Sequence, residues 1–460
     1  KNNVVLVYKK NFDNNKIINI MTFIKKQRYE QHDNEKGSFY KSSIKPLNSN
    51  DKLDQDLNID ICIIGGGLTG MSTALNLSKK GYSVALCEAK NIGSGASGRN
   101  GGQLGIGMRK DQFYLEKKLG KIHARGLWDL GIEAVDETLN LIKKNNINCS
   151  LVNGILSAGC FDNDYKYFDL ELNHLLKYYN FKNYKIFNKE EIRSQIKTNI
   201  YKSGLLNLNS YHLNPLKLLI GLSKLSINEN VKIFENTPVL KLEEHKDYIL
   251  VHCKNNKIKS KKVVVACNGY LDNLINKKSN IFMPINNYVI ATEPLGKEKA
   301  KEIIRNNYAV HDTRFIIDYY RFSEDWRLIF GGGETFSAYF LKDSKDFVHK
   351  RMLKVFPQLR NYNIEFSWGG TLAITINRLP SFGTMMNNKL IYAFGYSGHG
   401  LALSVLSGKL IKEKIEENTE RFNLFAKIKH LSIPGANIFR RPMYSSAIFY
   451  YKLRDLINYF

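Results

Sequence analysis

Residues 60–70, with the sequence DICIIGGGLTG, constrain the fold of this chain more than any other segment. An apolar run of strand length ends in a glycine turn, and residues 71–78 contain no proline or glycine and predict a helix. Gly65, Gly67 and Gly70 match the spacing G-x-G-x-x-G. The first glycine permits a tight turn, the second lets the backbone approach phosphate, and the third lets helix and strand pack closely. We therefore expect a pyrophosphate to bind at the start of this helix, where free N–H groups and the helix dipole attract anions.

The residues after this helix complete the unit. Residues 83–87 predict a second strand, which ends at Glu88. A carboxylate at this place can accept hydrogen bonds from both hydroxyls of an adenosine ribose. A lone glycine pattern is weak evidence, but here strand, turn, helix, strand and acid follow one another in the required order. The segment therefore predicts a βαβ unit that binds a dinucleotide.

Composition narrows the class of protein. The chain has 460 residues, of which 43% are hydrophobic and 12% aromatic, which indicates a globular protein with two or three domains. A net charge of +25 is typical of proteins that bind nucleic acids or membrane surfaces. The lysines are scattered along the chain, however, and no block of Lys and Arg interleaved with aromatic residues stands out. The sequence therefore carries no strong signal for a nucleic-acid partner.

The cysteines and the apolar runs indicate the cellular compartment in which the protein works. The six cysteines form no C-x-x-C pair, and several lie in apolar, strand-like runs, where a reduced buried thiol is the ordinary state. We therefore expect no metal site, no disulfides and a cytoplasmic location. No apolar run approaches the ~20 residues that span a bilayer. Residues 1–20 are polar and lack the apolar centre of a signal peptide, and we hypothesise that translation begins at Met21, the first methionine.

Two further segments are rich in glycine. Residues 91–103, NIGSGASGRNGGQ, directly follow the strand that ends at Glu88. Such a stretch exposes backbone donors and cannot build a core; it is either a flexible linker or a second loop around the dinucleotide, and its position favours the loop. Residues 390–400 repeat the order of strand and glycine-rich turn, and a helix follows to about residue 417. This helix offers a second N-terminus to an electron-rich ligand group.

Between these segments the strand pattern changes. Strand-like runs between residues 231 and 267 predict a second entry into a parallel sheet, with a small meander. Strands dominate residues 282–330 and predict a mixed or antiparallel sheet. This order indicates an α/β fold in which a nucleotide-binding domain is interrupted by a substrate domain. The expected segments are a polar N-terminal segment at 1–56, the nucleotide-binding domain at 57–147, 204–275 and 366–430, the substrate domain at 148–203 and 276–365, and a C-terminal tail at 431–460.

Two local patterns between residues 112 and 160 predict individual helices and strands. Residues 112–144 have apolar side chains at steps of three or four, which predicts a long helix that Gly120 or Gly131 could interrupt. Residues 149–160 look like a pair of strands around Asn153 and Gly154, a common turn dipeptide.

The glycine segments also carry a resemblance to a known family. The matching pieces are residues 63–70, 95–103, 327–332, 368–380, 395–400 and the tail at 433–454. The run ASGRNGGQ at 96–103 is the most specific of them. From about residue 39 to the end, the chain resembles the FAD-dependent amine and amino-acid oxidoreductases of the D-amino-acid oxidase superfamily, and most of all the γ-glutamylputrescine oxidase-like branch. The resemblance implies a Rossmann-like FAD-binding domain with an inserted substrate domain.

The resemblance implies FAD rather than NAD. The three glycines of the first turn would face the pyrophosphate, Glu88 the ribose and Val239 the adenine. The helix after Gly400 would point its N-terminus at the N1/O2 edge of the flavin. Residues 368–383 correspond to the stretch in which some relatives attach FAD through a cysteine; they contain none, so we expect non-covalent binding. The residues expected to contact FAD are Gly65, Gly67, Leu68, Thr69, Gly70, Glu88, Ala89, Ser97, Arg99, Asn100, Gly101, Gly102, Gln103, Val239, Ala266, Gly269, Gly395, Gly398, His399, Gly400 and Leu401.

Three residues are candidates for catalysis. His399, between two glycines at the start of the last helix, is either a neighbour of flavin and substrate or a structural turn residue. Arg378 either holds a substrate carboxylate in bidentate fashion or is an arginine of the surface or of a domain interface. Tyr320, like the adjacent Tyr319 and Arg321, lies on a predicted strand of the substrate domain, where a residue either faces the substrate or packs in the core.

The family chemistry moves a hydride from the carbon next to an amine nitrogen to the flavin, and the imine is then hydrolysed. A carboxylate on the substrate suits the basic candidates; γ-glutamylputrescine has one, but so do glycine, sarcosine and D-amino acids. The electron acceptor is either O2 or another carrier. A flavoenzyme acting on RNA and a flavin-binding protein without turnover stay open as alternatives. An NAD-dependent dehydrogenase is less favoured, because it leaves two glycine-rich segments without a role.

Overall fold

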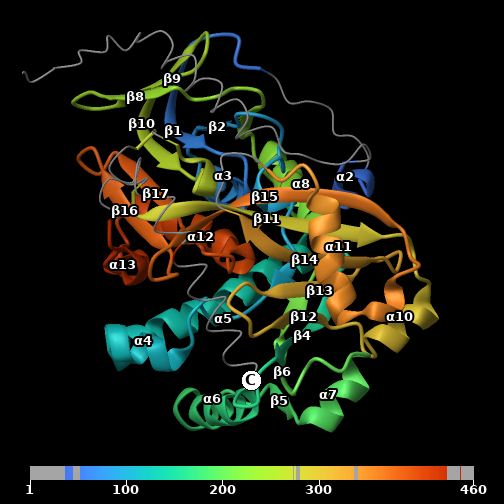
Figure 1. The fold of residues 1–460 in the computed structure, drawn as a ribbon. Helices are drawn as coiled ribbons and strands as arrows, with labels where there is room; N and C mark the ends of the chain where they lie inside the picture. Colours follow the sequence, from blue (N-terminus) through green and yellow to red (C-terminus); the bar gives the residue numbers. More distant parts are fainter. Residues whose placement is uncertain are drawn as a thin grey trace, which may run out of the picture.

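The computed structural model describes residues 37–44, 52–272, 274–275, 280–335, 340–432 and 446. Met21 and residues 433–445 and 447–460 of the predicted tail lie outside these residues. The described chain folds into two β-sheets with helices packed on and between them (Figure 1).

The first sheet is the mostly parallel sheet that the dinucleotide unit predicts. Its main path runs in the order β16 (Ser381–Met385), β17 (Leu390–Phe394), β10 (Lys257–Val265), β1 (Leu57–Ile64), β2 (Val84–Cys87) and β7 (Lys232–Phe234). Parallel pairing links β17, β10, β1, β2 and β7, whereas β16 is antiparallel to β17. A hairpin of β8 (Lys241–Glu244) and β9 (Ile249–His252) pairs with β10. This arrangement brings the loops after β1, β2 and β10 to one edge of the sheet.

Strand β1 is buried on both faces because its side chains alternate between two cores. Ile61 and Ile63 belong to the larger core, which also contains the apolar faces of the helices α3 (Leu68–Ser78), α8 (Pro215–Asn228), α5 (Lys121–Lys144) and α12 (Leu401–Ile415). Cys62 and Ile64 face the opposite side, where β9 and β17 contribute side chains. This double burial explains why the strand reads as a continuous apolar run.

The second sheet is mixed, as the sequence predicts. Its order is β15 (Ile364–Thr375), β11 (Phe282–Thr292), β14 (Leu328–Thr335), β13 (Asp318–Phe322), β12 (Ala309–Asp312), β4 (Val152–Gly159), β6 (Ser203–His212) and β3 (Gln103–Leu104), with β5 (Tyr184–Phe187) paired to β6. Only β12 and β4 pair in parallel among these described strands. One face packs in a separate core with helix α11 (Ser344–Val355). The other face looks toward the first sheet and its loops.

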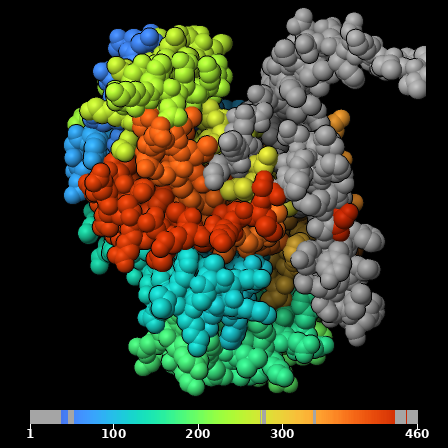
Figure 2. Space-filling model, turned by 90° about the vertical axis from the view of Figure 1, so that its left-hand side faces the viewer, coloured from blue at the N-terminus to red at the C-terminus, as the bar shows by residue number. Residues whose placement is uncertain are grey.

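The remaining helices lie around these layers. They are α2 (Phe39–Ser42), α4 (Gln112–Leu119), α6 (Asp164–Tyr179), α7 (Lys189–Gln195), α10 (Lys297–Ile303) and α13 (Glu420–Ala426), with short 3-10 turns at Ala96–Gly98, Asn268–Tyr270 and Pro357–Leu359. In Figure 2 the red C-terminal part, which includes α13, lies between the yellow-green β8–β9 region above and the cyan α4 and α5 below. In the part of the chain that the structure describes, no helix is long and apolar enough to cross a membrane.

Sheet membership differs from the expected segment boundaries at three places. β6 spans the boundary expected at 204, and it pairs with β4 and β5 of the second sheet. β15 also belongs to the second sheet, although a return to the first domain was expected at 366. β3, within the expected first FAD-binding segment, pairs with β6. Residues 149–160 contain the single strand β4 (Val152–Gly159) instead of a hairpin. An apolar run can join either sheet, because strand pairing depends on distant partners.

Candidate active site

A cavity of about 600 Å³ lies where β1 and β2 end. Its walls include the glycine turn after β1, Glu88 and Ala89 after β2, and Val239 before β8. Apart from Gly70, the residues expected to bind the pyrophosphate, ribose and adenine therefore line one space. Their convergence follows from parallel pairing, since the carboxyl ends of neighbouring parallel strands meet at one edge.

The glycine turn leaves no room for side chains. A Cβ on Gly70 would lie 1.9 Å from the carbonyl oxygen of Gly65, and a Cβ on Gly65 would lie 2.8 Å from the carbonyl oxygen of Ala266. Helix α3 begins after Gly67 without a side-chain cap, and the Leu68 N–H donates to the Ser97 hydroxyl at 3.0 Å. The turn thus presents bare backbone and a helix N-terminus to the cavity, as the binding of a pyrophosphate requires.

Glu88 is held in place by backbone donors. Its Oε2 accepts a hydrogen bond from the Gly66 N–H at 2.7 Å, and its Oε1 accepts one from the Lys90 N–H at 2.9 Å. Burial raises the pKa of the Glu88 carboxyl, partly opposed by these hydrogen bonds. The carboxylate can therefore accept a ribose hydroxyl on its remaining lone pairs.

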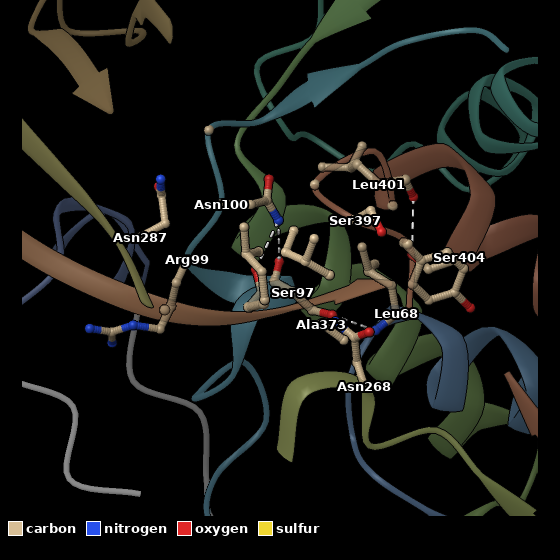
Figure 3. A pocket seen from close by; sticks show the side chains of 18 of the residues that line it. Leu68, Ser97, Arg99, Asn100, Asn268, Asn287, Ala373, Ser397, Leu401 and Ser404 are labelled. Carbon is tan, nitrogen blue, oxygen red and sulfur yellow. Dashed lines mark hydrogen bonds between the residues drawn. The ribbon is translucent and has the colours of Figure 1, made fainter. Parts of the chain in front are cut away.

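A second cavity of about 190 Å³ adjoins the first. The two share Gly67, Ala96, Ser97, Ala266 and Asn268 in their walls, so they form one continuous slot. The slot contains the glycine turn of the first sheet in its walls and extends to side chains of the second sheet. Figure 3 shows the second cavity, with Leu68 of helix α3 and Asn287 of β11 in its wall. An outer cavity lined by the glycine turn, joined to an inner cavity lined by apolar and polar side chains, fits a dinucleotide with a reactive ring at the inner end.

The loop at 96–103 crosses this slot and is fixed by its own side chains. The Asn100 amide donates to the carbonyl oxygens of Ala96 and Ser97 at 3.0 and 3.1 Å, as Figure 3 shows, and accepts from the Gly102 N–H at 2.8 Å. The second sheet holds the loop from the other side, since Trp368 Nε1 donates to the Arg99 carbonyl oxygen at 3.0 Å. The segment is thus an ordered wall of the slot, as expected, and the linker interpretation is wrong.

The start of α12 forms the opposite wall. Gly398, Gly400, Leu401 and Ser404 line the second cavity, and the N-cap Gly400 provides no side-chain hydrogen bond. The free N–H groups and the positive end of the helix dipole therefore face the inner end of the slot.

Most of the residues expected to contact the cofactor line the two cavities. They are Gly65, Gly67, Leu68, Thr69, Glu88, Ala89, Ser97, Arg99, Asn100, Gly101, Gln103, Val239, Ala266, Gly398, Gly400 and Leu401. Five others are absent from the cavity walls, namely Gly70, Gly102, Gly269, Gly395 and His399. The four glycines allow close packing or a left-handed backbone instead; a Cβ on Gly269, for example, would lie 2.9 Å from the Thr371 carbonyl oxygen.

The position of His399 contradicts its expected catalytic role. Its Nε2 lies 3.0 Å from the carbonyl oxygen of Ile106, and its ring packs against Gly105, where a Cβ would lie 3.1 Å from Cε1. Burial, and then the charge of Arg109, lower the pKa of His399 to about 4, so the imidazole is neutral at pH 7. His399 therefore ties the loop after β3 to the start of α12 and is absent from both cavity walls.

The position of Tyr320 also contradicts its expected role. Its ring stacks on Phe330 in the core beneath the second sheet, and its hydroxyl donates to the Tyr201 hydroxyl at 3.0 Å. Successive side chains on a strand point to opposite faces, so the adjacent Tyr319 faces the cavity. The Tyr319 hydroxyl donates to Asn287 Oδ1 at 2.5 Å. The sequence placed both tyrosines on a strand but gave no sign of which face each one takes.

The structure places Arg378 in the wall of the second cavity and adds two charged residues that sequence reasoning missed. Arg109 follows β3 and Glu334 lies near the end of β14; both line the same cavity. Burial, and then the charge of Arg378, lower the pKa of Arg109 to about 10, while Glu334 acts in the opposite direction. Arg109 ends the run GIGMR directly after the recognised loop, and this proximity is the signal that could have found it.

Comparison with known proteins gives the family. Residues 60–414 match the model of the DAO family, described as FAD dependent oxidoreductase. The chain belongs to this family. It is 33% identical to gamma-glutamylputrescine oxidoreductase of Escherichia coli (strain K12), over 92% of this chain and 98% of that protein. It is 34% identical to the probable oxidoreductase OrdL of Haemophilus influenzae, over 88% of this chain and 93% of that protein.

A solved structure shows the same fold. Glycine oxidase from Geobacillus kaustophilus superposes with a TM-score of 0.68 at 17% identity, over 78% of this chain and 95% of that chain. The expected fold class, family and cofactor are thus confirmed, and the protein is an FAD-dependent oxidoreductase. Within the described residues, no group of three or more His, Cys, Asp or Glu side chains could hold a metal ion.

Proposed function

We propose that this enzyme oxidises a C–N bond of an amine or amino acid, and that its substrate resembles γ-glutamylputrescine. The name and the near-complete coverage of the relative from Escherichia coli support this substrate. The observation that carries the proposal is the continuous slot, whose outer part fits a dinucleotide and whose inner part combines apolar walls with Arg109 and Arg378. A substrate with both a reactive amine and a carboxylate matches that combination.

The slot suggests how FAD lies. The first cavity would hold the adenosine and the pyrophosphate, and the second would hold the flavin ring beside Gly101, Leu401 and the start of α12. Cys87 and Cys267 line the first cavity, whereas no cysteine is found among the described residues that line the second. This supports non-covalent binding, since no thiol faces the place proposed for the ring.

The bound flavin would supply the acceptor for a hydride from the carbon next to the amine nitrogen. The neutral amine would thereby become an iminium ion, which water converts into a carbonyl compound and an ammonium ion. The residues of the chain bind and orient the amine. Leu372, Ile374 and Leu401 form an apolar part of the cavity wall. An apolar wall excludes water from the substrate amine, which favours the neutral form that can lose a hydride.

Tyr319 and Asn287 provide the polar part of the same wall. The Asn287 amide donates to the Gly333 carbonyl oxygen at 3.0 Å and accepts from the Tyr319 hydroxyl. Burial raises the pKa of Tyr319 well above its ordinary value, so the phenol keeps its proton. Its oxygen can still accept a hydrogen bond from a substrate N–H, which would orient the amine without a strong base.

Anaerobic mixing tests the proposal. The purified, FAD-loaded enzyme is mixed with γ-glutamylputrescine, putrescine, glycine, sarcosine and D-alanine, and the flavin absorbance near 450 nm is followed. We expect the fastest bleaching with γ-glutamylputrescine. Faster bleaching by glycine, sarcosine or D-alanine would replace the proposed substrate, and no bleaching by any amine would contradict the proposed reaction. Peroxide formation in air, compared with reduction of a quinone, then identifies the electron acceptor.

A further inference from the structure

Three charged side chains from separate elements meet in the wall of the second cavity. Arg109 comes from the loop between β3 and α4, Glu334 from β14, and Arg378 from the turn after β15. Glu334 is the one carboxylate among the described residues that line this cavity. The cavity wall also contains Arg99, whose Nε donates to the Gly369 carbonyl oxygen at 2.5 Å. Apart from Arg99, two positive residues and one negative residue thus line a space next to the apolar wall formed by Leu372 and Ile374.

Arg378 is held in an unusual backbone conformation. Its φ is +59°, in the left-handed region that residues other than glycine seldom adopt. The Arg378 N–H donates to the Thr375 carbonyl oxygen at 3.0 Å, and the guanidinium carbon lies 4.5 Å from the centre of the Phe315 ring. Such strain persists where the surroundings enforce it and where a side chain has a task. Here it places a flat cation on an aromatic face beside the cavity.

Arg109 forms no hydrogen bond or ion pair with any of the described residues. The charge of Arg378 opposes that of Arg109, and the charge of Glu334 favours it. With a pKa of about 10, Arg109 stays protonated at pH 7. Two guanidinium groups that share one cavity repel each other, and an anion between them relieves the repulsion.

We propose that Arg109, Arg378 and Glu334 form a binding site for the α-amino-acid head of the substrate. The two guanidinium groups bind the α-carboxylate, and Glu334 binds the α-ammonium group. This inference rests on the proposed function and narrows it to acylated amines that carry a free amino-acid group at the end remote from the oxidised carbon. γ-Glutamylputrescine has this form.

The charge of Glu334 separates this class from simple α-amino acids. A carboxylate next to an ammonium group stabilises the protonated form, and a protonated amine cannot release a hydride from its α-carbon. The amine bound by Glu334 is therefore the one that is kept from oxidation. The amine that is oxidised lies toward the apolar wall and the flavin, where the neutral form is favoured.

Two substrates with the same reacting amine test the site. γ-Glutamylputrescine carries the charged head, whereas N-acetylputrescine replaces it with a neutral acetyl group. For Arg109→Gln we expect kcat/KM for γ-glutamylputrescine to fall roughly 10- to 100-fold, mainly through KM. With N-acetylputrescine we expect a change of less than about threefold. Glu334→Gln should show the same selectivity with a smaller loss.

Lys110→Gln is the matched control, because Lys110 neighbours Arg109 in sequence, packs on the Tyr114 ring and is absent from the cavity wall. The ratio of flavin to protein and the melting temperature confirm that each variant is folded and loaded. An equal loss with both substrates, or no loss with either, would overturn the head-group site. If the wild-type enzyme oxidises neither acylated amine, the proposed substrate fails before any variant is compared.

Discussion

The two ends of the slot are built in different ways. The outer end consists mainly of backbone from short, contiguous segments: the turn after β1 and the loop after β2. The inner end consists of side chains such as Tyr319, Asn287 and Arg378, which come from different strands of the second sheet and their connections. A site built from backbone is recognisable in the sequence by glycines at positions where a Cβ cannot fit. A site built from side chains depends on the register of strands that are far apart in the sequence.

From this contrast we expect the end proposed for the cofactor to tolerate little change. Gly65 and Gly70 each have a backbone oxygen within 3 Å of the place where a Cβ would lie, whereas the substrate end can exchange side chains on a constant sheet. Members of one family can then share a cofactor and differ in substrate. The expected effects of substitution should therefore be largest in the first turn and more selective in the second sheet.

Gly70→Ala should have the largest effect. The added Cβ would lie 1.9 Å from the Gly65 carbonyl oxygen, so α3 must move away from β1 and the pyrophosphate turn must open. We expect the purified variant to lose nearly all bound FAD, measured as the absorbance ratio at 450 and 280 nm. Gly81→Ala is the control, since its Cβ would meet no atom within 4 Å and Gly81 lies in neither cavity wall. Retention of FAD by Gly70→Ala would refute a backbone-built outer end.

Arg321→Met should break the connection between the two ends. Buried Arg321 donates from Nε to the Gly101 carbonyl oxygen at 2.9 Å and from Nη2 to the Tyr40 hydroxyl at 3.1 Å. Removal of these bonds leaves buried acceptors unpaired, which costs about 2–4 kcal/mol of unfolding free energy. We expect a lower melting temperature and weaker FAD binding, measured by flavin fluorescence.

Arg321→Lys and Tyr40→Phe sharpen this experiment. The lysine keeps the charge but cannot reach several acceptors at once, and the phenylalanine removes one bond only. We expect both to fall between the wild type and Arg321→Met in FAD affinity. If Arg321→Met binds FAD normally while its stability falls, the second sheet does not position the loop at 96–103, and the two ends are independent.

The same contrast decides how much the sequence could predict. The first βαβ unit, the loop at 96–103 and the start of α12 were found because glycine spacing is local information. Gly120 ends α4, whereas Gly131 lies within α5 where a Cβ would lie 2.5 Å from the backbone of Gly107; sequence alone cannot separate a helix break from a close contact. The sequence could not tell which of Tyr319 and Tyr320 faces the cavity. The face that a strand buries depends on partners far away in the sequence.

Acid should destabilise the second sheet through His212. This side chain is 1% exposed, and burial, followed by the charge of Arg321, lowers the pKa of His212 to about 3. Unfolded His212 takes up a proton below about pH 6.5, whereas the folded form stays neutral until about pH 3. The unfolding free energy should therefore fall as the pH drops through this range, by on the order of 2 kcal/mol at pH 5 from this group.

The variant His212→Gln isolates that contribution. Glutamine can keep a donor for the Asn307 carbonyl oxygen, which His212 Nε2 contacts at 2.7 Å, but it does not titrate. Urea unfolding at pH 7.5 and pH 5 should show a smaller loss of stability for the variant than for the wild type. His311 and His399 are also held neutral and remain in both proteins, so only the difference between them reports on His212. An identical pH dependence would contradict a buried neutral His212.

Tyr320→Phe should have the smallest effect and tests which face of β13 serves the reaction. The change removes one hydrogen bond, to Tyr201, and leaves the stack on Phe330 in place, so we expect a loss of about 1 kcal/mol of stability. Turnover should stay within about twofold of the wild type. Tyr319→Phe removes the hydroxyl that faces the cavity and donates to Asn287, and should lower kcat/KM about tenfold with little change in melting temperature. The two adjacent variants thus separate an effect on stability from an effect on turnover. Slow turnover in Tyr320→Phe together with normal turnover in Tyr319→Phe would mean that the substrate approaches the opposite face of the sheet.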